Sequence, residues 1–394
     1  MFDPSILLDA YELVRIEFLN LYFRGAARPP PAIRRHIMKS RNMWILVFQM
    51  ALLSLTPRPA NSDPMYSLTY IGLTDARGGI SDTGFIAGSN GFVDEWHAGT
   101  ITRLGVGQAY SVNNAGTVVG QTPDGMADEW SNGTLTKLGQ GAALGINDLG
   151  QVVGYRISGN TASPTLWTGG TASTLTPLGG PSGLAFGINN AGQVVGTSVG
   201  TGFATLWQNG TAQNLGTLPG TKQSIAYSIN ATGQIVGQTL DSQGIFQPFS
   251  YQNGLMSDLG TLPGYPSAIA ISVNSSGSIV GYSFFGGPIT TYRPYIYQNG
   301  QMTNLNDLIL PNSGWTMEVA NGINDLGQIV GFGDYRGHQN AGFLLTPCNG
   351  DSCFVDQPDI PQPTPEPATS LLLFFGLLGA VFMPRSKRKP FQAA

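Results

Sequence analysis

The sequence predicts an all-β protein, a seven-bladed β-propeller of four-stranded repeats, on three observations. One motif occurs seven times between residues 80 and 331. A second motif, an aromatic-ended run that often leads into Asn-Gly, alternates with the first. The composition also fits short strands joined by tight turns. Gly makes up 54 of the 394 residues, about twice its usual share of ~7%. Only 11% of the residues are charged, whereas ~25% is usual.

The first motif reads apolar residue, Asn or Ser, two variable residues, Gly, one residue, two apolar residues and a closing Gly. Its seven copies are Ile80–Gly88, Val112–Gly120, Ile146–Gly154, Ile188–Gly196, Ile229–Gly237, Val273–Gly281 and Ile323–Gly331. The second motif is clearest at Trp207-Gln208-Asn209-Gly210, which leads to Leu215-Gly216. A period of 32 to 50 residues between closing glycines is typical of repeat architectures such as propellers.

The two motifs contain turn chemistry. Asn-Gly between apolar runs is a strong hairpin signal, because both residues tolerate positive φ. In the first motif the Asn side chain can bond the backbone two residues on, and the Gly supplies a left-handed position. We therefore interpret six asparagines as turn residues, with a ligand-binding ring as the alternative: Asn113, Asn147, Asn189, Asn230, Asn274 and Asn324.

Each repeat then holds four short strands. The body begins with a lone strand over Tyr66–Leu73 and ends with a lone strand over Gly342–Leu345. Pairing these two would close the ring with strands from both ends and remove an exposed edge. An open β-solenoid is the alternative fold, but it would need capping repeats.

The repeats resemble a known family. The segment from Ala185 to Gly196, followed by Ala204-Thr205-Leu206-Trp207, is similar to the HAF extracellular repeat, although Leu184 or other residues replace that family's first His. The resemblance covers roughly residues 66–346, and we assign residues 63–347 to the repeat domain. The resemblance implies that the protein is exported and built from repeats, and it implies no catalytic activity.

The N-terminal region predicts export. Lys39 and Arg41 precede a 13-residue apolar run from Met43 to Leu55, the layout of a signal peptide and short for a membrane span. We assign residues 38–62 to this signal and its helix; a buried core segment is the alternative. Residues 1–37 form an extension of doubtful status, since translation could begin at Met38 or Met43.

The C-terminal region predicts sorting. A Cys-containing loop and Pro-rich linker occupy residues 348–364. Residues 365–394 then hold an apolar run and a basic cluster, the layout of a transmembrane helix whose basic end stays in the cytoplasm. This segment resembles the PEP-CTERM sorting signal, through Pro365, Glu366, Pro367, Arg385, Lys387 and Arg388. The resemblance implies processing by an exosortase, a membrane peptidase of Gram-negative bacteria that make exopolysaccharide; an ordinary tail anchor is the alternative.

Charge and motifs exclude several functions. Between Asn61 and Thr364 there are 7 Lys/Arg and 18 Asp/Glu, a net charge of −11 that disfavours nucleic-acid partners. No cofactor motif, metal site or catalytic residue is predicted. Cys348 and Cys353 are predicted to form a small disulfide loop, because an exported chain favours oxidation; two free thiols are the alternative. The paired carboxylates Asp94-Glu95 and Asp128-Glu129 are interpreted as solvent-facing repeat residues rather than glycosidase acids.

Function is expected on the face that carries the variable connections, because variable loops on a rigid scaffold usually carry recognition. We select four candidate ligand-binding residues there: Arg293, Trp315, Tyr335 and Arg336. The prediction is an exported, non-catalytic cell-surface or extracellular-matrix protein of the kind found in biofilms. It would bind exopolysaccharide or another envelope partner and be anchored transiently in the inner membrane. A polysaccharide-active hydrolase or lyase and a purely structural envelope protein are the alternatives.

Overall fold

The computed structural model describes residues 66–89, 91–286, 291–349 and 353. The predicted extension, signal peptide and sorting segment, with most of the linker, lie outside these residues. The chain divides into two units, Met1–Val355 and Asp356–Ala394, and all that follows concerns the first. No helix within the described ranges has the length and apolar character needed to span a membrane.

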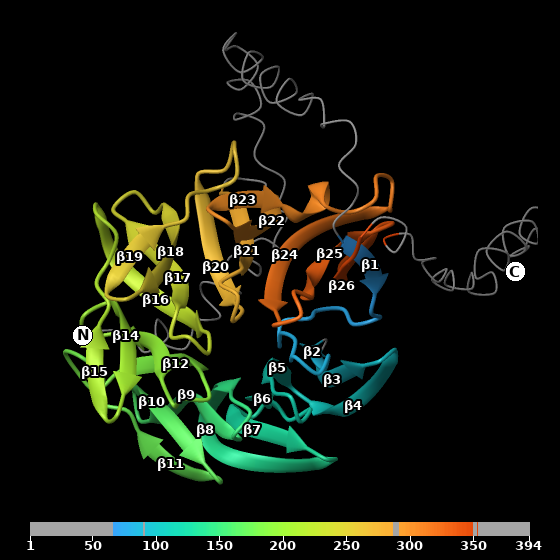
Figure 1. The fold of residues 1–394 in the computed structure, drawn as a ribbon. Helices are drawn as coiled ribbons and strands as arrows, with labels where there is room; N and C mark the ends of the chain where they lie inside the picture. Colours follow the sequence, from blue (N-terminus) through green and yellow to red (C-terminus); the bar gives the residue numbers. More distant parts are fainter. Residues whose placement is uncertain (1–65, 90, 287–290, 350–352, 354–394) are drawn as a thin grey trace, which may run out of the picture. The chain divides into compact units, whose positions relative to one another are not determined.

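The described chain is an all-β propeller, which confirms the predicted fold class. Its strands form sheets arranged around a central space (Figure 1), and the one helical element among the described residues is the short 3₁₀-helix η4 (Leu305–Asp307). Three four-stranded sheets each hold one complete repeat, with neighbouring strands in chain order. They are β12 (Gly183–Ile188), β13 (Val194–Ser198), β14 (Phe203–Gln208) and β15 (Thr211–Asn214); β16 (Thr221–Ile229), β17 (Ile235–Asp241), β18 (Phe246–Gln252) and β19 (Leu255–Asp258); and β20 (Ser267–Val273), β21 (Ile279–Phe285), β22 (Thr291–Gln298) and β23 (Gln301–Asn304).

The expected set of seven separate four-stranded sheets is wrong, because the described strands form six sheets. One sheet has seven strands, since the 13-residue β8 pairs with β7 through its first half and with β9 through its second half. Its strands are β5 (Gln108–Val112), β6 (Val118–Gln121), β7 (Met126–Ser131), β8 (Thr134–Ile146), β9 (Gln151–Ser158), β10 (Thr161–Thr168) and β11 (Thr171–Thr174).

Another sheet has only three strands: β2 (Ile86–Ser89), β3 (Phe92–His97) and β4 (Thr100–Val106). The segment before β2, where a fourth strand was expected, forms only an isolated bridge between Ile80 and Ile86. This copy of the repeat is therefore irregular next to the central space.

The remaining sheet is closed by strands from both ends of the described chain, as predicted. It holds β24 (Trp315–Ile323), β25 (Ile329–Tyr335), β26 (His338–Pro347) and β1 (Tyr66–Tyr70). Tyr66 lies opposite Pro347, and Tyr70 lies opposite Phe343. The pairing gives the outer strand of this sheet a partner from the other end of the sequence.

The closing Gly of the first motif has a packing reason. The register between β12 and β13 shifts between Ala185 and Gly187, so that Phe186 forms a bulge. A Cβ on Gly196 would lie 1.9 Å from the carbonyl oxygen of Leu184. Five further copies are as tight, at 1.8–2.0 Å: Gly120, Gly154, Gly237, Gly281 and Gly331. Only Gly fits where the bulged inner strand crosses its neighbour.

Candidate functional site at the centre of the propeller

The ends of the strands define two faces of different construction. Because consecutive strands are antiparallel, the Asn-x-x-Gly and Asn-Gly turns lie at one end of the strands, which we name the turn face. The other connections lie at the opposite end, the loop face. The inner strands run from the loop face to the turn face and line the central space.

On the turn face, the six asparagines of the first motif join successive turns. Asn189 Oδ1 accepts hydrogen bonds from the backbone N–H groups of Ala191 (3.1 Å) and Gln193 (3.0 Å), while its Nδ2 donates to the carbonyl oxygen of Asn230 (3.0 Å). Six such Nδ2 bonds, of 2.8–3.1 Å, run from Asn113 round to Asn324, which donates to Ser81. The interpretation as turn residues is correct. Each amide also links its turn to the next, so the asparagines are engaged in structure.

The residues that follow these asparagines form a second, outer ring. Asn114 N donates to Asp148 Oδ1 (3.0 Å), and Asp325 N donates to Asp82 Oδ1 (2.7 Å). A cavity of about 250 Å³ lies inside the two rings and is lined by all seven turns. The turn-face mouth therefore carries three exposed carboxylates, Asp82, Asp148 and Asp325.

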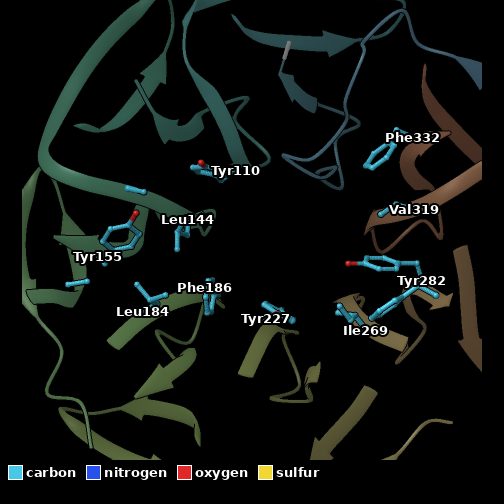
Figure 2. Packing of buried hydrophobic residues seen from close by; sticks show 13 residues of the cluster. Tyr110, Leu144, Tyr155, Leu184, Phe186, Tyr227, Ile269, Tyr282, Val319 and Phe332 are labelled. Atoms are coloured by element: carbon cyan, nitrogen blue, oxygen red, sulfur yellow. The ribbon is translucent and has the colours of Figure 1, made fainter. Parts of the chain in front are cut away.

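A second cavity, of about 180 Å³, lies deeper in the central space. The residue three places before each Asn lines it in six copies: Tyr110, Leu144, Phe186, Tyr227, Ile271 and Asn321. Figure 2 shows four of these side chains, those of Tyr110, Leu144, Phe186 and Tyr227, gathered around the centre. In the irregular seventh copy this position is Gly78, and Arg77, one place earlier, is the one Lys or Arg among the residues that line the cavity.

Two local features explain which side chains line this cavity: each is followed by a small residue, and a bulge takes it out of the regular pairing register. The next residue in each copy is Gly or Ser, because adjacent inner strands touch there: a Cβ on Gly187 would lie 2.9 Å from the carbonyl oxygen of Tyr227. The bulge leaves Phe186 outside the regular pairing register. Its side chain joins an apolar cluster with Leu184 and Tyr227. The cavity is thus walled by large side chains from strands.

The loop-face candidates Trp315, Tyr335 and Arg336 lie together, but two of them are buried. The Trp315 and Tyr335 rings stack at 4.8 Å, with Tyr70 stacked on Tyr335 at 5.8 Å. Trp315 is 8% exposed and Tyr335 is 1% exposed. Only Arg336 is exposed, with its guanidinium 5.2 Å from the Tyr335 ring. The structure therefore leaves little of the Trp315 and Tyr335 side chains accessible to a ligand, because their rings pack against each other within one sheet.

The fourth candidate, Arg293, belongs to a different group on the loop face. It is half-buried and donates from Nη1 to the carbonyl oxygen of Tyr292 (2.8 Å). Burial and the charge of Asp334 raise the pKa of Glu318, and the charge of Arg293 opposes that rise. Burial and the Glu318 charge raise the pKa of Tyr292. Arg293 therefore acts electrostatically on the same carboxyl group as Asp334, that of Glu318.

The paired carboxylates serve structure, and one of each pair is not solvent-facing as expected. Asp94 is buried and accepts from Arg103 Nε (3.0 Å), while Asp128 is buried and accepts from Thr122 N (3.2 Å). Successive side chains on a strand point to opposite sides of the sheet, so Asp94 and Glu95 cannot act on one bond. Burial raises the pKa of Asp128 and of Glu129.

Two further sequence-based expectations concern cysteine and metals. Cys348 and Cys353 are joined by a disulfide, with Cα atoms 5.2 Å apart. Across the part of the chain that the structure describes, no three His, Cys, Asp or Glu side chains gather closely enough to hold a metal ion.

Sequence reasoning missed the cavity-lining residues because it searched the connections, whereas Tyr110, Phe186 and Tyr227 lie on inner strands. A usable signal exists: a large residue directly before Gly or Ser, three places before the motif's Asn. Arg77 does not follow this signal, because Gly78 stands three places before Ser81 and Arg77 lies one place earlier.

Comparisons with known proteins support the fold. No family model and no curated protein matches the sequence. A selenomethionine-substituted virginiamycin B lyase from Staphylococcus aureus is similar in structure, with TM-score 0.51 and 11% identity over 72% of this chain and 100% of that chain. A streptogramin B lyase has TM-score 0.48 and 13% identity over 73% of this chain and 100% of that chain. YCF48 bound to D1 peptide has TM-score 0.46 and 13% identity over 75% of this chain and 98% of that chain. Only the first of these three structures has a TM-score above 0.5, and at 11% identity its likeness concerns the fold alone.

Proposed function

We propose that this chain is an exported, non-catalytic surface or extracellular-matrix protein that binds exopolysaccharide from the loop-face side of its central space. The observation that carries the proposal is the contrast between the two ends. On the turn face, polar groups are engaged with one another from copy to copy. The deeper cavity is instead lined by a varied set of side chains, in which Arg77 and Asn321 lie beside aromatic residues that are 5–8% exposed, and varied side chains around a cavity in a rigid scaffold are typical of recognition.

We also propose that the six sheets represent seven blades. The seven-stranded sheet then counts as two blades joined by β8, and the three-stranded sheet counts as one blade with an irregular inner segment. The lining of one cavity by all seven turns supports this count.

Export and sorting belong to the same proposal. The signal at 38–62 would direct export, and the PEP-CTERM-like segment at 365–394 would anchor the chain in the inner membrane until an exosortase-type peptidase releases it to the cell surface. The Cys348–Cys353 disulfide is consistent with an oxidising compartment. N-terminal sequencing of protein recovered from cells tests the signal, and retention of Met1 would contradict it.

The function is tested with the full chain purified from cells that export it. Purified polysaccharides are screened for saturable binding and, in the same samples, for loss of chain length. Saturable binding without turnover supports the proposal, whereas turnover would favour a hydrolase or lyase. Absence of binding would favour a purely structural envelope protein.

A matched pair of variants tests the face. Phe186→Ala, which alters the cavity, should weaken binding, and circular dichroism checks that it folds. Leu149→Ala, at a 69% exposed position on the turn face, should leave binding unchanged. The reverse pattern would show that the turn face binds the ligand.

A further inference from the structure

We propose that Asp128 is a neutral carboxylic acid in the folded chain and acts as a pH-sensitive latch for the loop-face connection between β6 and β7. Asp128 donates its proton to Thr122 in this arrangement, and loss of the proton lets Lys137 exchange one carboxylate for another. The inference does not depend on the proposed function, because it concerns how one connection of the loop face is held.

The first argument compares two neighbouring copies of the repeat. Asp94 lies directly opposite Arg103 in the ladder of β3 and β4. Asp128 lies opposite Lys137 in the equivalent ladder of β7 and β8. Arg103 Nε donates to Asp94 Oδ1 (3.0 Å), so this carboxylate has its cation. Lys137 Nζ instead donates to Asp124 Oδ2 (2.8 Å), which leaves Asp128 without an ion pair among the described residues.

The second argument is the burial of Asp128. The residue is 0% exposed, whereas the side chains of Asp124 and Lys137 are 56% and 52% exposed. Asp128 Oδ1 has no hydrogen-bond partner in the part of the chain that the structure describes. Asp128 Oδ2 bonds Thr122, through its backbone N–H (3.2 Å) and its hydroxyl Oγ1 (2.5 Å). An ionised carboxylate in this position would be a buried charge without a cation, so burial favours the neutral acid.

The third argument is a count of protons. Thr122 Oγ1 bonds the carboxyl groups of both Asp124 and Asp128, but a hydroxyl has one proton to donate. The hydrogen bonds from Lys137 and Thr122 lower the pKa of Asp124, so Asp124 is the ionised carboxylate of the two. The Thr122 proton therefore goes to Asp124, and the other bond is completed by a proton on Asp128. Burial, which raises the pKa of Asp128, favours the same arrangement.

Loss of the Asp128 proton gives the connection a second arrangement. The charged groups that act on Asp128 are Lys137 of β8, which favours ionisation, and Asp124 of the connection, which opposes it. The neighbouring strand β6 has no charged residue, and Glu129 points to the opposite side of the sheet. Once Asp128 is ionised, Lys137 is the cation directly across the ladder. Lys137 then turns from Asp124 to Asp128, as in the preceding copy, and releases an exposed carboxylate at the loop face.

The first experiment follows the urea unfolding of the full chain from acidic to neutral pH and compares each variant with the wild type at the same pH. Asp128→Asn keeps a donor to Thr122 and cannot ionise, so it should match the wild type in acid and be more stable at neutral pH. The gain in the folding equilibrium constant should be about tenfold for each unit by which folding raises the pKa of Asp128.

The equivalent position in the preceding copy is the matched control. Asp94→Asn removes the ionised partner of Arg103 and should be less stable than the wild type at neutral pH. If Asp128→Asn also loses stability at neutral pH, the inference is overturned, because Asp128 would then be a stabilising carboxylate like Asp94.

A second experiment locates the proton. Carboxyl-carbon NMR of the full chain, labelled at Asp, follows the titration of Asp128, whose signal is identified by its absence from Asp128→Asn. Asp128 should titrate above the ordinary Asp pKa of about 3.9. Thr122→Val should lower this pKa, because the neutral acid loses its acceptor. A rise would show that Thr122 donates to an ionised Asp128, and it overturns the inference, as does an Asp128 pKa at or below the ordinary value.

The same titration tests the exchange of partners. Lys137→Gln should raise the pKa of Asp128, because the ionised form loses the cation that would pair with it. Lys222→Gln, which removes a cation from β16 in another sheet, should leave the pKa unchanged. Equal responses to the two substitutions would overturn the exchange and with it the latch.

Discussion

The two faces of the propeller differ in what their repeated residues do. On the turn face, Asn189 and its equivalents satisfy their own turn and the next one, so the same residue type returns in six of seven copies. On the loop-face side of these turns, the position three places before each Asn carries residues as different as Tyr110, Leu144, Phe186 and Asn321. Regularity is needed where every copy must contact its neighbour in the same way. Where that requirement is absent, side chains are free to differ, and recognition is expected there.

The largest expected effect concerns the strand crossing on which both faces depend. Gly196→Ala places a Cβ 1.9 Å from the Leu184 carbonyl oxygen, so the sheet must distort. We expect a loss of about 4 kcal/mol or more, measured by urea unfolding. Gly192→Ala is the matched control: its φ is +74° and nothing lies within 4 Å of the new Cβ, so the expected loss is about 1 kcal/mol. Equal losses would contradict the packing explanation.

The second prediction concerns the buried aromatic pair on the loop face, Trp315 and Tyr335. Trp315→Ala should cost about 3 kcal/mol, because the ring is buried and stacked on Tyr335. Phe285→Ala, 41% exposed on the same face, should change stability by less than about 0.5 kcal/mol. Both are measured by chemical unfolding. If Trp315→Ala abolished glycan binding at unchanged stability, the residue would be a ligand contact after all.

The third prediction tests the inter-turn bonds. Asn189→Asp keeps the acceptor for Ala191 and Gln193 but loses the donor to Asn230, and it buries a charge opposite a carbonyl oxygen. We expect a loss of about 2–3 kcal/mol at neutral pH. The new carboxylate would have a raised folded-state pKa, so stability should recover as the pH falls.

The neighbouring position is the control for this test. Asn190→Asp introduces the same charge at an exposed site, where it replaces the hydrogen bond from Asn190 Nδ2 to Asp148 Oδ2 (3.1 Å) with two neighbouring carboxylates, and it should cost less than about 1 kcal/mol. Equal effects at the two positions would show that charge repulsion on the turn face, and not the lost link, dominates.

These contrasts show what the sequence could predict. Period, turn residues and the pairing of Tyr66–Tyr70 with the last strand followed from local chemistry, because each depends on short motifs and ring closure. The continuity of β8 could not be predicted in this way. No residue in its sequence marks the point at which the strand changes its partner from β7 to β9. The burial of Trp315 and Tyr335 was not predicted either, because Tyr70 of β1, from the opposite end of the sequence, packs against both rings. The cavity wall was missed for another reason: its residues lie on inner strands, whereas the sequence analysis looked for binding residues in the connections.

The smallest expected effect concerns the carboxylates near Arg293. Burial and Asp334 raise the pKa of Glu318, so folding favours its protonated form. The stability from this group is present below the ordinary Glu pKa and is lost as pH rises through the folded-state value. Glu318→Gln should therefore match the wild type at acidic pH and be more stable by about 0.5 kcal/mol at neutral pH.

A double-mutant cycle with Asp334→Asn identifies the cause of this pH dependence. Asp334 Oδ1 accepts from Gly337 N (2.8 Å), a bond that the Asn side-chain oxygen preserves. If repulsion between the two carboxylates contributes, either substitution relieves it, and the double variant gains less than the sum of the single gains. Full additivity would mean that burial alone raises the pKa of Glu318. The loop face would then hold two independent carboxylates beside Arg293 in place of one coupled group.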